Sequence, residues 1–383
     1  MLKNQRSAFN IPRDTTYLNC GYMSPLPKKV EAAGINGLRR KRNPSEITAL
    51  DFFTEAHDLR KEYAKLINTP EQSRIVVIPS VSYGIANAAK NVPLGKGDEV
   101  IVASEEFPSD YYPWATRCEE VGATIKTITP PDSITRRGEQ WNLRILEAIN
   151  SKTKVVTLGN VHWADGTLFN LAEIRKRTKD VGAALIIDGT QSVGALPFDV
   201  QQVQPDALIC GGYKWLFGPY SMGIAYYGEM FDHGKPVEES WMNRLNSEDF
   251  RALINYQSQY KSGSLRYEVG EHSNFIHVPM MIESVKLINT WKPANIQKYC
   301  KSITKDAVKE LRSAGFWIED EDSRGQHLFG IRLPEHMDLD KIIPKFKKKK
   351  VFVSFRGNAI RVAVNVFNTK SDIDKLVSLL LSK

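Results

Sequence analysis

From residue 74 to residue 227, short apolar runs alternate with longer amphipathic stretches. The apolar runs are rich in β-branched residues and predict strands at 75–78, 99–103, 124–128, 154–159, 184–188, 207–210 and 223–227. The amphipathic stretches predict helices at 51–68, 82–91, 110–121, 143–150 and 171–181. Strands that alternate with helices are typical of a parallel sheet covered by helices. We therefore predict an α/β fold with a mostly parallel seven-stranded sheet.

The pattern changes after about residue 274. Two long helical stretches, 278–291 and 296–314, precede strands at 326–333, 351–355 and 360–366 and a closing helix at 370–381. The Gly-Asn step at 357–358 suits a hairpin turn. We predict an N-terminal segment (1–25), a large domain (26–274) and a smaller α+β C-terminal domain (275–383).

Composition excludes several classes of protein. The 383 residues are 42% hydrophobic and 25% charged, and no apolar run approaches the ~20 residues of a membrane span. The N-terminus lacks the apolar core of a secretory signal, which favours a cytoplasmic protein that does not associate with membranes. The four cysteines are far apart and form no CxxC pair, so we expect neither a metal site nor disulfides. They are Cys20, Cys118, Cys210 and Cys300.

The net charge is +8, from 52 basic and 44 acidic residues. Most basic residues are scattered, and the one dense run, Lys345 with 347–350, is interpreted as a solvated helix end or turn. We therefore expect no nucleic-acid partner, although a cationic surface attracts small anions.

Two charged residues follow adjacent predicted strands. Asp188 ends a buried strand, and Lys214 comes after the next one, flanked by Tyr213, Trp215 and Phe217. Because ligands of open parallel sheets bind beyond the carboxyl ends of the strands, both side chains are expected at one site. A partly desolvated lysine has a lowered pKa and can form a Schiff base with an aldehyde. A plain Asp-Lys ion pair explains the spacing equally well.

A second motif lies where the strand at 75–78 leads into a helix. Hydroxyl groups and free backbone N–H groups gather there, so a phosphate could bind at the helix N-terminus. An ordinary N-cap at Ser80 or Ser82 is the alternative. The sequence contains neither the GxGxxG nor the GxxxxGK[ST] nucleotide motif.

Together these segments resemble the class V aminotransferase group of fold type I pyridoxal-phosphate enzymes, which includes cysteine desulfurases, kynureninases and isopenicillin N epimerase. The resemblance covers nearly the whole chain. Residues 188–191 (Asp-Gly-Thr-Gln) resemble the group's D-G-x-Q segment, and 212–214 followed by Gly218-Pro219 resembles its cofactor-lysine segment. Residues 17–25 are similar to the N-terminal segment that brings a glycine, here Gly21, to the active site. Residues 107–110 (Phe-Pro-Ser-Asp) look like the kynureninase segment that supplies a ring over the cofactor.

The resemblance implies a role for each matching residue. Lys214 would hold pyridoxal phosphate and move the α-proton of the substrate. Asp188 would pair with the pyridine nitrogen, and Gln191 would donate to the ring oxygen. The other residues implied at the cofactor are Phe107 over the ring, Asp110 in the same segment, Trp163 where much of the group has an asparagine, and Val81, Ser82 and Tyr213 at the phosphate.

The predicted C-terminal strands supply a substrate anchor. Alternation places Arg361 between Ala359 and Ala363 on one face, which leaves room for a carboxylate beside the guanidinium. An exposed strand arginine is the alternative interpretation, but the resemblance matches Arg361 to the group's carboxylate-binding arginine. Arg356 is a possible second contact.

The chain departs from its relatives at three places. The loop 356–359, where cysteine desulfurases carry their nucleophile, holds no cysteine, which argues against a persulfide mechanism. His162 is either a proton shuttle or a loop histidine with structural partners. Glu271 stands where relatives often present a threonine to the phosphate of the partner subunit, and its charge would repel a phosphate.

The expected protein is a homodimeric pyridoxal-phosphate enzyme that acts on a small amino acid. Transamination is favoured, while a kynureninase-like lyase, a C–S lyase and an epimerase remain open. A cofactor-free binding protein that uses its basic surface is an alternative from another class.

Overall fold

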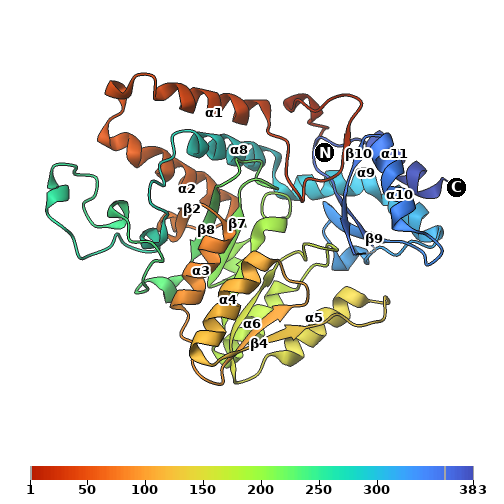
Figure 1. The fold of residues 1–383 in the computed structure, drawn as a ribbon, viewed down its shortest axis with the longest axis horizontal. Helices are drawn as coiled ribbons and strands as arrows, with labels where there is room; N and C mark the ends of the chain where they lie inside the picture. Colours follow the sequence, from red (N-terminus) through yellow and green to blue (C-terminus); the bar gives the residue numbers. More distant parts are fainter. Residues whose placement is uncertain (1, 358, 383) are drawn as a thin grey trace.

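The computed structural model describes residues 2–357 and 359–382. Its central feature is a seven-stranded sheet in the order β2-β8-β7-β6-β5-β3-β4 (Figure 1). Strand β8 runs antiparallel to both of its neighbours, and the other neighbouring pairs are parallel, so the predicted mostly parallel sheet is confirmed. The strands are β2 (Ile75–Ile78), β3 (Glu99–Ala103), β4 (Thr124–Ile128), β5 (Thr153–Gly159), β6 (Ala184–Asp188), β7 (Ala207–Gly211) and β8 (Gly223–Tyr227).

Helices cover both faces of this sheet because successive strand residues point to opposite sides. Along β6, Leu185 and Ile187 pack into one apolar cluster, and Ala184 and Ile186 pack into the other. The first cluster also takes residues from α2 (Thr54–Ile67), α5 (Arg137–Ala148), α6 (Leu171–Val181) and α8 (His277–Trp291). The second takes residues from α3 (Val81–Asn91) and α4 (Pro108–Val121).

Two helices of this region differ from the prediction. Helix α5 starts at Arg137, so the expected start at residue 143 is wrong; its polar first turn hides the amphipathic pattern. Helix α1 (Lys28–Arg40) was not predicted, because two of its three buried residues are glycines. A Cβ at Gly37 would lie 2.0 Å from the Phe275 carbonyl oxygen, so the absence of a side chain permits α1 to approach the start of α8. A short helix, α7 (Val200–Val203), completes this part.

The C-terminal part contains a three-stranded antiparallel sheet in the order β11-β12-β9. Its strands are β9 (Leu328–Arg332), β11 (Ser354–Arg356) and β12 (Ala359–Ala363), with helices α9 (Pro293–Ser313), α10 (Leu339–Lys348) and α11 (Lys370–Leu381). Arg356 pairs with Ala359, which confirms the hairpin, although Asn358 of its turn lies outside the described residues. Helix α10 was not predicted as an element, but the lysine run does lie at its C-terminal end.

The N-terminal segment joins the two sheets. Strand β1 (Thr16–Tyr17) pairs in parallel with β10 (Val351–Phe352), which splits the strand predicted at 351–355 into two. The Cys20 N–H donates to the Ala363 carbonyl oxygen at 3.3 Å, and the Ser24 N–H donates to the Tyr213 carbonyl oxygen at 3.0 Å. This segment therefore links β12 to the loop that carries Lys214.

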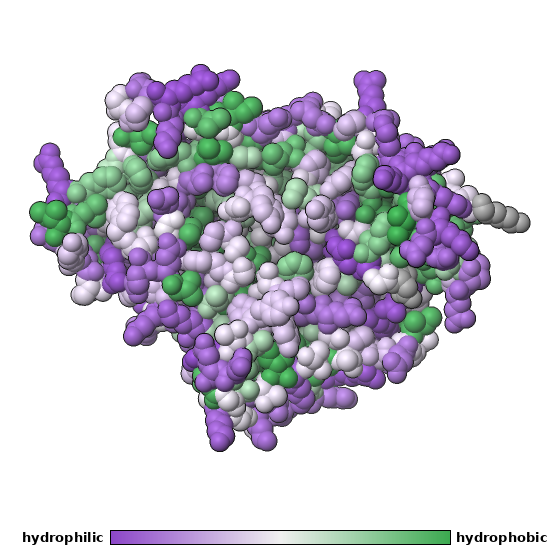
Figure 2. Space-filling model, in the orientation of Figure 1, coloured by the Kyte–Doolittle hydropathy of each residue, from purple (hydrophilic) through white to green (hydrophobic). Residues whose placement is uncertain are grey.

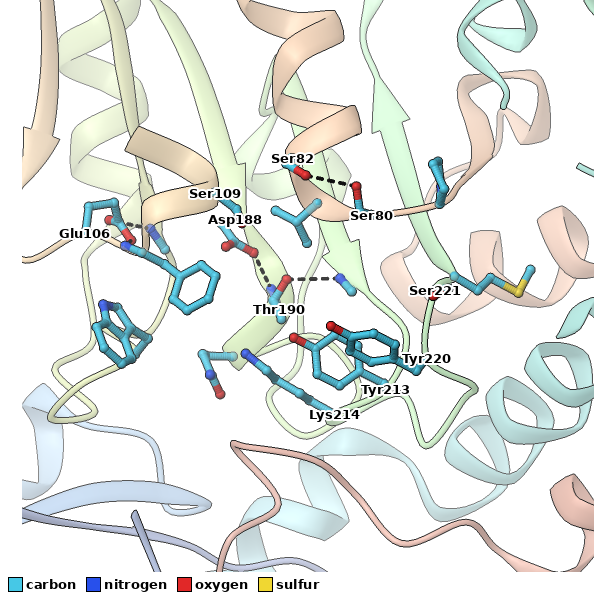
Figure 3. Close-up of a pocket in the computed structure, with 18 of the residues that line it drawn as sticks. Ser80, Ser82, Glu106, Ser109, Asp188, Thr190, Tyr213, Lys214, Tyr220 and Ser221 are labelled. Carbon is cyan, nitrogen blue, oxygen red and sulfur yellow. Dashed lines mark hydrogen bonds between the residues drawn. The ribbon is translucent and has the colours of Figure 1, made fainter. Parts of the chain in front are cut away.

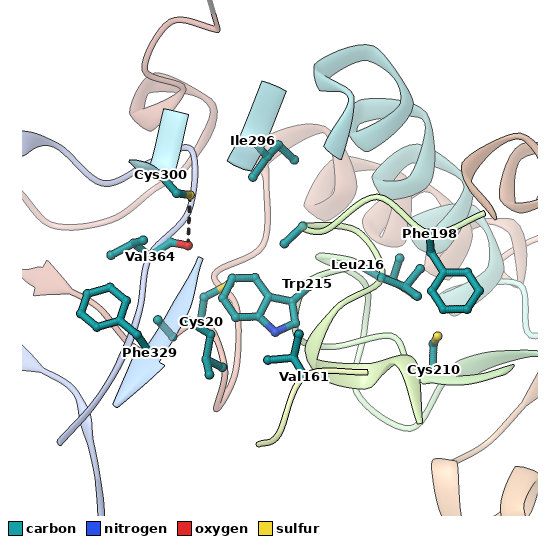
Figure 4. Packing of buried hydrophobic residues seen from close by; sticks show 14 of the residues in the cluster. Cys20, Val161, Phe198, Cys210, Trp215, Leu216, Ile296, Cys300, Phe329 and Val364 are labelled. Carbon is teal, nitrogen blue, oxygen red and sulfur yellow. Dashed lines mark hydrogen bonds between the residues drawn. The ribbon is translucent and has the colours of Figure 1, made fainter. Parts of the chain in front are cut away.

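One apolar cluster runs through both parts of the chain (Figure 4). Trp215 and Val161 from the first part lie near Phe329 and Val364 from the second. The boundary expected near residue 274 therefore stays a prediction. The four cysteines are buried and unpaired in disulfides. Within the described residues, no helix combines the length and apolar character needed to cross a bilayer.

Candidate active site

A cavity of about 350 Å³ lies beyond the carboxyl ends of the parallel strands (Figure 3). Its walls come from the loops after β2, β3, β5, β6 and β7, which is where an open α/β sheet binds ligands. Many of the predicted site residues line it: Val81, Ser82, Phe107, Trp163, Asp188, Gln191, Tyr213 and Lys214.

Lys214 follows β7 and extends into this cavity (Figure 3). The residue is only 6% exposed, and its Nζ lies 5.2 Å from the Phe107 ring centroid. Burial lowers the pKa of the amine to about 8, against the opposing effect of the Asp188 carboxylate. No ion pair joins Lys214 to Asp188 within the described residues, so the simple ion-pair interpretation does not describe this structure. The amine is poised to lose its proton near neutral pH.

Asp188 ends β6 on the same side of the cavity. Its Oδ1 accepts the Thr190 N–H at 2.8 Å, and the Thr190 hydroxyl oxygen accepts the Gly211 N–H at 3.0 Å. Burial raises the pKa of Asp188, although the contacts from Thr190 act in the opposite direction. A cationic nitrogen on a bound ligand would offset that burial and favour the carboxylate form.

The N-terminus of α3 supplies the polar wall opposite. Ser80 is the N-cap, because its hydroxyl oxygen accepts the Tyr83 N–H at 3.2 Å. The Ser82 hydroxyl lies 2.9 Å from that of Ser80 and faces the cavity together with Val81. Ser80 therefore caps the helix, while Ser82, whose hydroxyl also contacts that of Ser80, lies at the helix N-terminus where an anion would bind.

An aromatic pair closes a further side. The Phe107 ring meets the Trp163 ring edge-on, with centroids 5.4 Å apart, and Trp163 Nε1 donates to the Glu105 carbonyl oxygen at 2.6 Å. Sequence reasoning missed Glu106, which lines the same wall. Its carboxylate accepts the N–H groups of Phe107 at 2.8 Å and Gly159 at 3.2 Å. Glu106 thereby holds the loop of Phe107 against the end of β5.

Asp110 does not line the cavity, although the sequence placed it there. It is fully buried in the first turn of α4, and its Oδ1 accepts the Thr157 hydroxyl at 2.7 Å. Burial, together with the charges of Glu106 and Asp188, raises its pKa well above the ordinary value. Asp110 thus lies behind the cavity wall, because the first turn of α4 faces the sheet and not the opening.

Gln191 reaches the cavity, whereas Gly21 does not. Gln191 Nε2 donates to the Gly21 carbonyl oxygen at 3.0 Å, and its Oε1 accepts Trp215 Nε1–H at 2.9 Å. A Cβ on Gly21 would lie 3.3 Å from that Oε1 and 3.0 Å from Leu328 Cδ1. Gly21 therefore contacts the site through Gln191, and only one of the amide hydrogens of Gln191 is left to meet a ligand.

Arg361 and Arg356 also lie outside the cavity wall. Arg361 is 1% exposed, so the interpretation as an exposed strand arginine is wrong. It donates to the Trp163 carbonyl oxygen at 2.7 Å and to the Ser354 hydroxyl at 3.3 Å, while its Nε has no partner. Burial, reinforced by Arg356, lowers its pKa to about 9. Within the described residues no carboxylate pairs with this buried guanidinium, which is an unusual state for a charge.

The sequence left the roles of His162 and Glu271 open, and the structure shows what surrounds each of them. The ring nitrogens of His162 lie 3.1 Å from Asp165 Oδ1 and 3.1 Å from the Ser104 carbonyl oxygen, and the histidine does not line the cavity. Burial alone would lower its pKa, but Asp165 outweighs burial and raises it. Both observations favour the loop histidine over the proton shuttle. Glu271 is exposed, with φ of 58°.

Other lining residues were missed. Thr190 lies in the Asp-Gly-Thr-Gln segment, between the predicted site residues Asp188 and Gln191, and this position could have identified it. Tyr220 and Ser221 follow Gly218-Pro219, and Ser221 adopts φ of 61°. Nothing in their local pattern distinguishes them from an ordinary loop.

The family described as Aminotransferase class-V matches residues 41–376, and the chain belongs to it. This places the protein among the fold type I enzymes that depend on pyridoxal phosphate. The predicted family, fold class and cofactor are therefore confirmed.

The similar proteins bear two kinds of name, aminotransferase and cysteine desulfurase. An uncharacterized aminotransferase of Bacillus subtilis, YcbU, is 26% identical over 325 residues, covering 85% of this chain and 82% of its own. A cysteine desulfurase of Escherichia coli O8 is 30% identical over 262 residues, covering 67% of this chain and 61% of its own.

Solved structures show the same fold. The cysteine desulfurase CsdA of Escherichia coli superposes with a TM-score of 0.81 at 18% identity, covering 98% of this chain and 96% of its own. The cystine C-S lyase C-DES, in complex with its reaction product cysteine persulfide, has a TM-score of 0.84 at 16% identity, covering 96% of this chain and 97% of its own.

The cavity has the donor set that pyridoxal phosphate needs. The buried Lys214 amine, with a pKa of about 8, can bond to the aldehyde, and the buried Asp188 carboxyl can pair with the ring nitrogen. Phe107 offers an apolar face, and Ser82 with the first turn of α3 offers hydroxyl and N–H donors to a phosphate. The residues present therefore fit the group that the family implies.

Proposed function

We propose that this enzyme transfers the amino group of a small amino acid to a 2-oxo acid. The observation that carries the proposal is the Lys214 amine, which is buried, pairs with no carboxylate among the described residues, and lies near the Phe107 ring and the Asp188 carboxylate. A lysine with a lowered pKa can act both as nucleophile and as proton carrier near neutral pH.

Bound pyridoxal phosphate supplies a ring that withdraws electrons from the substrate α-carbon. Each neighbouring residue then has a task. Lys214 removes the α-proton and returns a proton to complete the transfer. Asp188 would pair with the ring nitrogen of the bound cofactor, Ser82 would donate to its phosphate, and Phe107 would pack against its ring.

Arg361 is proposed to bind the substrate carboxylate. Among the described residues, its buried guanidinium has no carboxylate partner and its Nε has no hydrogen-bond partner, so burying this charge costs free energy that no nearby carboxylate offsets. A substrate carboxylate would provide the missing charge in bidentate geometry. Since Arg361 does not line the cavity, the contact requires Trp163, whose carbonyl oxygen accepts from it, to shift on binding.

A C–S lyase reaction is the second candidate. The named relatives include cysteine desulfurases, and C-DES is a cystine C-S lyase. The cysteine arrangement separates this chain from a desulfurase mechanism, because all four cysteines are buried and none lines the cavity. A lyase reaction here would therefore release its product without a cysteine nucleophile.

The first experiment is a visible spectrum of the purified protein before and after borohydride, followed by an amino-acid screen with and without a 2-oxo acid acceptor. Transamination predicts a yellow band, and it predicts more than one equivalent of product per active site only when the acceptor is present. Release of many equivalents of pyruvate, alanine or sulfide per active site without an acceptor would replace this proposal with the lyase. A protein that stays colourless with added pyridoxal phosphate would overturn both.

We also propose a cytoplasmic homodimer. Hydrophobic side chains remain exposed over α1 (Figure 2), where Ile35 is 44% and Leu38 is 61% exposed. Further along, Ile254 is 82% and Tyr256 is 96% exposed. A second copy would cover these side chains. Four unpaired buried cysteines suit a reducing compartment. Sedimentation equilibrium tests the dimer, and a monomer at micromolar concentration would contradict it.

A further inference from the structure

The net positive charge of the chain is concentrated in its C-terminal part, although basic residues occur throughout the sequence. Residues 275–383 contain 20 Lys and Arg but 12 Asp and Glu, which equals the whole net charge of +8. Residues 1–274 contain 32 of each sign. A charge imbalance confined to one part of a chain indicates a local electrostatic function.

Part of that charge lines a groove of about 450 Å³ between α9 and residues 321–326. Lys301, Lys305 and Lys309 lie four residues apart, so they share one side of α9 at a spacing of about 6 Å. Arg312 continues the row, and Arg324 lies across the groove. The row thus presents a line of ammonium groups opposite a guanidinium.

Arg324 is the unusual member of this set. It is 5% exposed, and its Nε and Nη1 donate at 3.2 Å to the carbonyl oxygens of Glu319 and Gly325. Its guanidinium lies 5.1 Å from the Phe329 ring centroid. Burial, reinforced by Arg312, lowers its pKa to about 10. Within the described residues no carboxylate pairs with it, although a buried charge is ordinarily paired.

Nearby carboxylates neutralise only part of the groove. Glu321 pairs with Lys301, and Asp320 lies 3.4 Å from Arg312. Lys305 and Lys309, both exposed, form no ion pair with any described residue. The groove therefore keeps a net positive charge with a buried guanidinium at its wall.

We propose that this groove binds a small, multiply charged anion that carries phosphate groups. The planar guanidinium of Arg324 matches a phosphate bidentately, and the lysine row would meet a second charged group a few ångströms away. The volume lies in the range of small-molecule sites. The groove shares no lining residue with the cofactor cavity, and the inference does not depend on the reaction proposed above.

The test is calorimetric titration of the pyridoxal-phosphate-loaded, full-length protein with pyrophosphate at constant ionic strength. Loading with cofactor keeps the probe away from Ser82 and the α3 N-terminus. We expect saturable binding with a dissociation constant on the order of 0.1 mM. The double variant Lys305→Glu/Lys309→Glu should bind at least about tenfold more weakly. The control Lys348→Glu/Lys349→Glu makes the same charge change at the exposed end of α10 and should bind as the unchanged protein does.

Arg324→Gln is the second variant, and it should also weaken binding about tenfold or more. Because Arg324 is buried, the circular dichroism spectrum and the cofactor band of this variant are first compared with those of the parent protein. If the variant misfolds, the Lys305→Glu/Lys309→Glu result tests the proposal. Inorganic phosphate is titrated beside pyrophosphate and should bind more weakly, since it cannot span the row. Absence of saturation at several millimolar pyrophosphate would overturn the proposal. Equal losses of pyrophosphate affinity in Lys305→Glu/Lys309→Glu and in the control Lys348→Glu/Lys349→Glu would also overturn it, because they would indicate an effect of overall charge.

Discussion

The cofactor cavity and the surroundings of Arg361 in the three-stranded sheet show two ways of burying a charged side chain. In the cavity, Lys214 and Asp188 lie at the ends of adjacent strands, buried yet open to a ligand. Arg361 lies on β12, 1% exposed and closed off behind Trp163. The first region is ready for its ligand, whereas the second must open before a substrate can reach it.

This difference follows from how each charge is compensated. Burial lowers the pKa of Lys214 to about 8, so the amine can discard its charge near neutral pH. Burial also lowers the pKa of Arg361, but only to about 9, so the guanidinium stays charged at pH 7. A group that can become neutral suits covalent chemistry, and a group that must stay charged suits recognition of an anion.

The largest expected effect is that of Lys214→Ala, which removes the amine from the cavity. We expect kcat/KM to fall about a thousandfold, because nucleophile and proton carrier are lost together. The cofactor band should lose its sensitivity to borohydride. Lys90→Ala serves as control, since Lys90 only donates to the Pro236 carbonyl oxygen. Retention of more than a tenth of the activity would show that another base serves the reaction.

Arg361→Met tests the closed region. We expect kcat/KM to fall about a hundredfold, mainly through KM, because the substrate carboxylate loses its partner. The melting temperature without substrate should fall by no more than a few degrees, since an unpaired buried charge is removed along with two hydrogen bonds. Arg332→Met on β9 is the matched control; Arg332 stacks on Trp317 and should leave KM unchanged. An unchanged KM in Arg361→Met would remove this residue from the site.

The pH dependence of cofactor loading probes the open region. Only the neutral Lys214 amine attacks an aldehyde, so the loading rate of apoprotein should rise about tenfold from pH 7 to pH 9 and level off above its pKa of about 8. Asp188 raises the pKa of this lysine, so Asp188→Asn should shift the profile to lower pH. Stopped-flow absorbance measures the rate, and a profile that is flat between pH 7 and pH 9 would contradict the lowered pKa.

The same shift affects the stability of the apoprotein. The folded-state pKa lies below the unfolded value of 10.5, so the penalty for burying the charged amine is fully present below pH 8. It disappears as the pH rises toward 10.5. Lys214→Met removes this penalty, so its advantage in the free energy of unfolding should shrink across that interval, as denaturant titration would measure.

The smallest expected effects distinguish the roles of Ser80 and Ser82 at the start of α3. Ser82→Ala should weaken cofactor affinity about twofold to tenfold through one lost hydrogen bond. Ser80→Ala removes the N-cap of α3 and should lower the free energy of unfolding by about 1 kcal/mol with little change in affinity. Fluorescence titration and thermal unfolding measure the two quantities, and identical behaviour of both variants would refute this division of roles.

The strands of the large sheet could be predicted because each is a short apolar run bounded by turn residues, and the observed bounds of β2, β3, β4, β6 and β8 match. Helix α1 was not predicted because two of its buried positions are glycines, which interrupt the hydrophobic periodicity of a helix. The short pairing of β1 with β10 escaped because it joins residues far apart in the chain.

For the site, the sequence by itself determined which groups stand at the carboxyl ends of the strands: Asp188, Lys214, Phe107 and Ser82 follow from local patterns and a family resemblance carried by contiguous segments. The tertiary structure alone decided how deeply each charge is buried and what surrounds it. Only there does Asp110 lie behind the cavity wall, Arg361 contact the Trp163 carbonyl oxygen, and Arg324 line the α9 groove without an ion pair to any described carboxylate. The physical reason is that strand order follows from local hydrophobic periodicity, whereas desolvation and pairing of a charge depend on side chains that distant segments bring together.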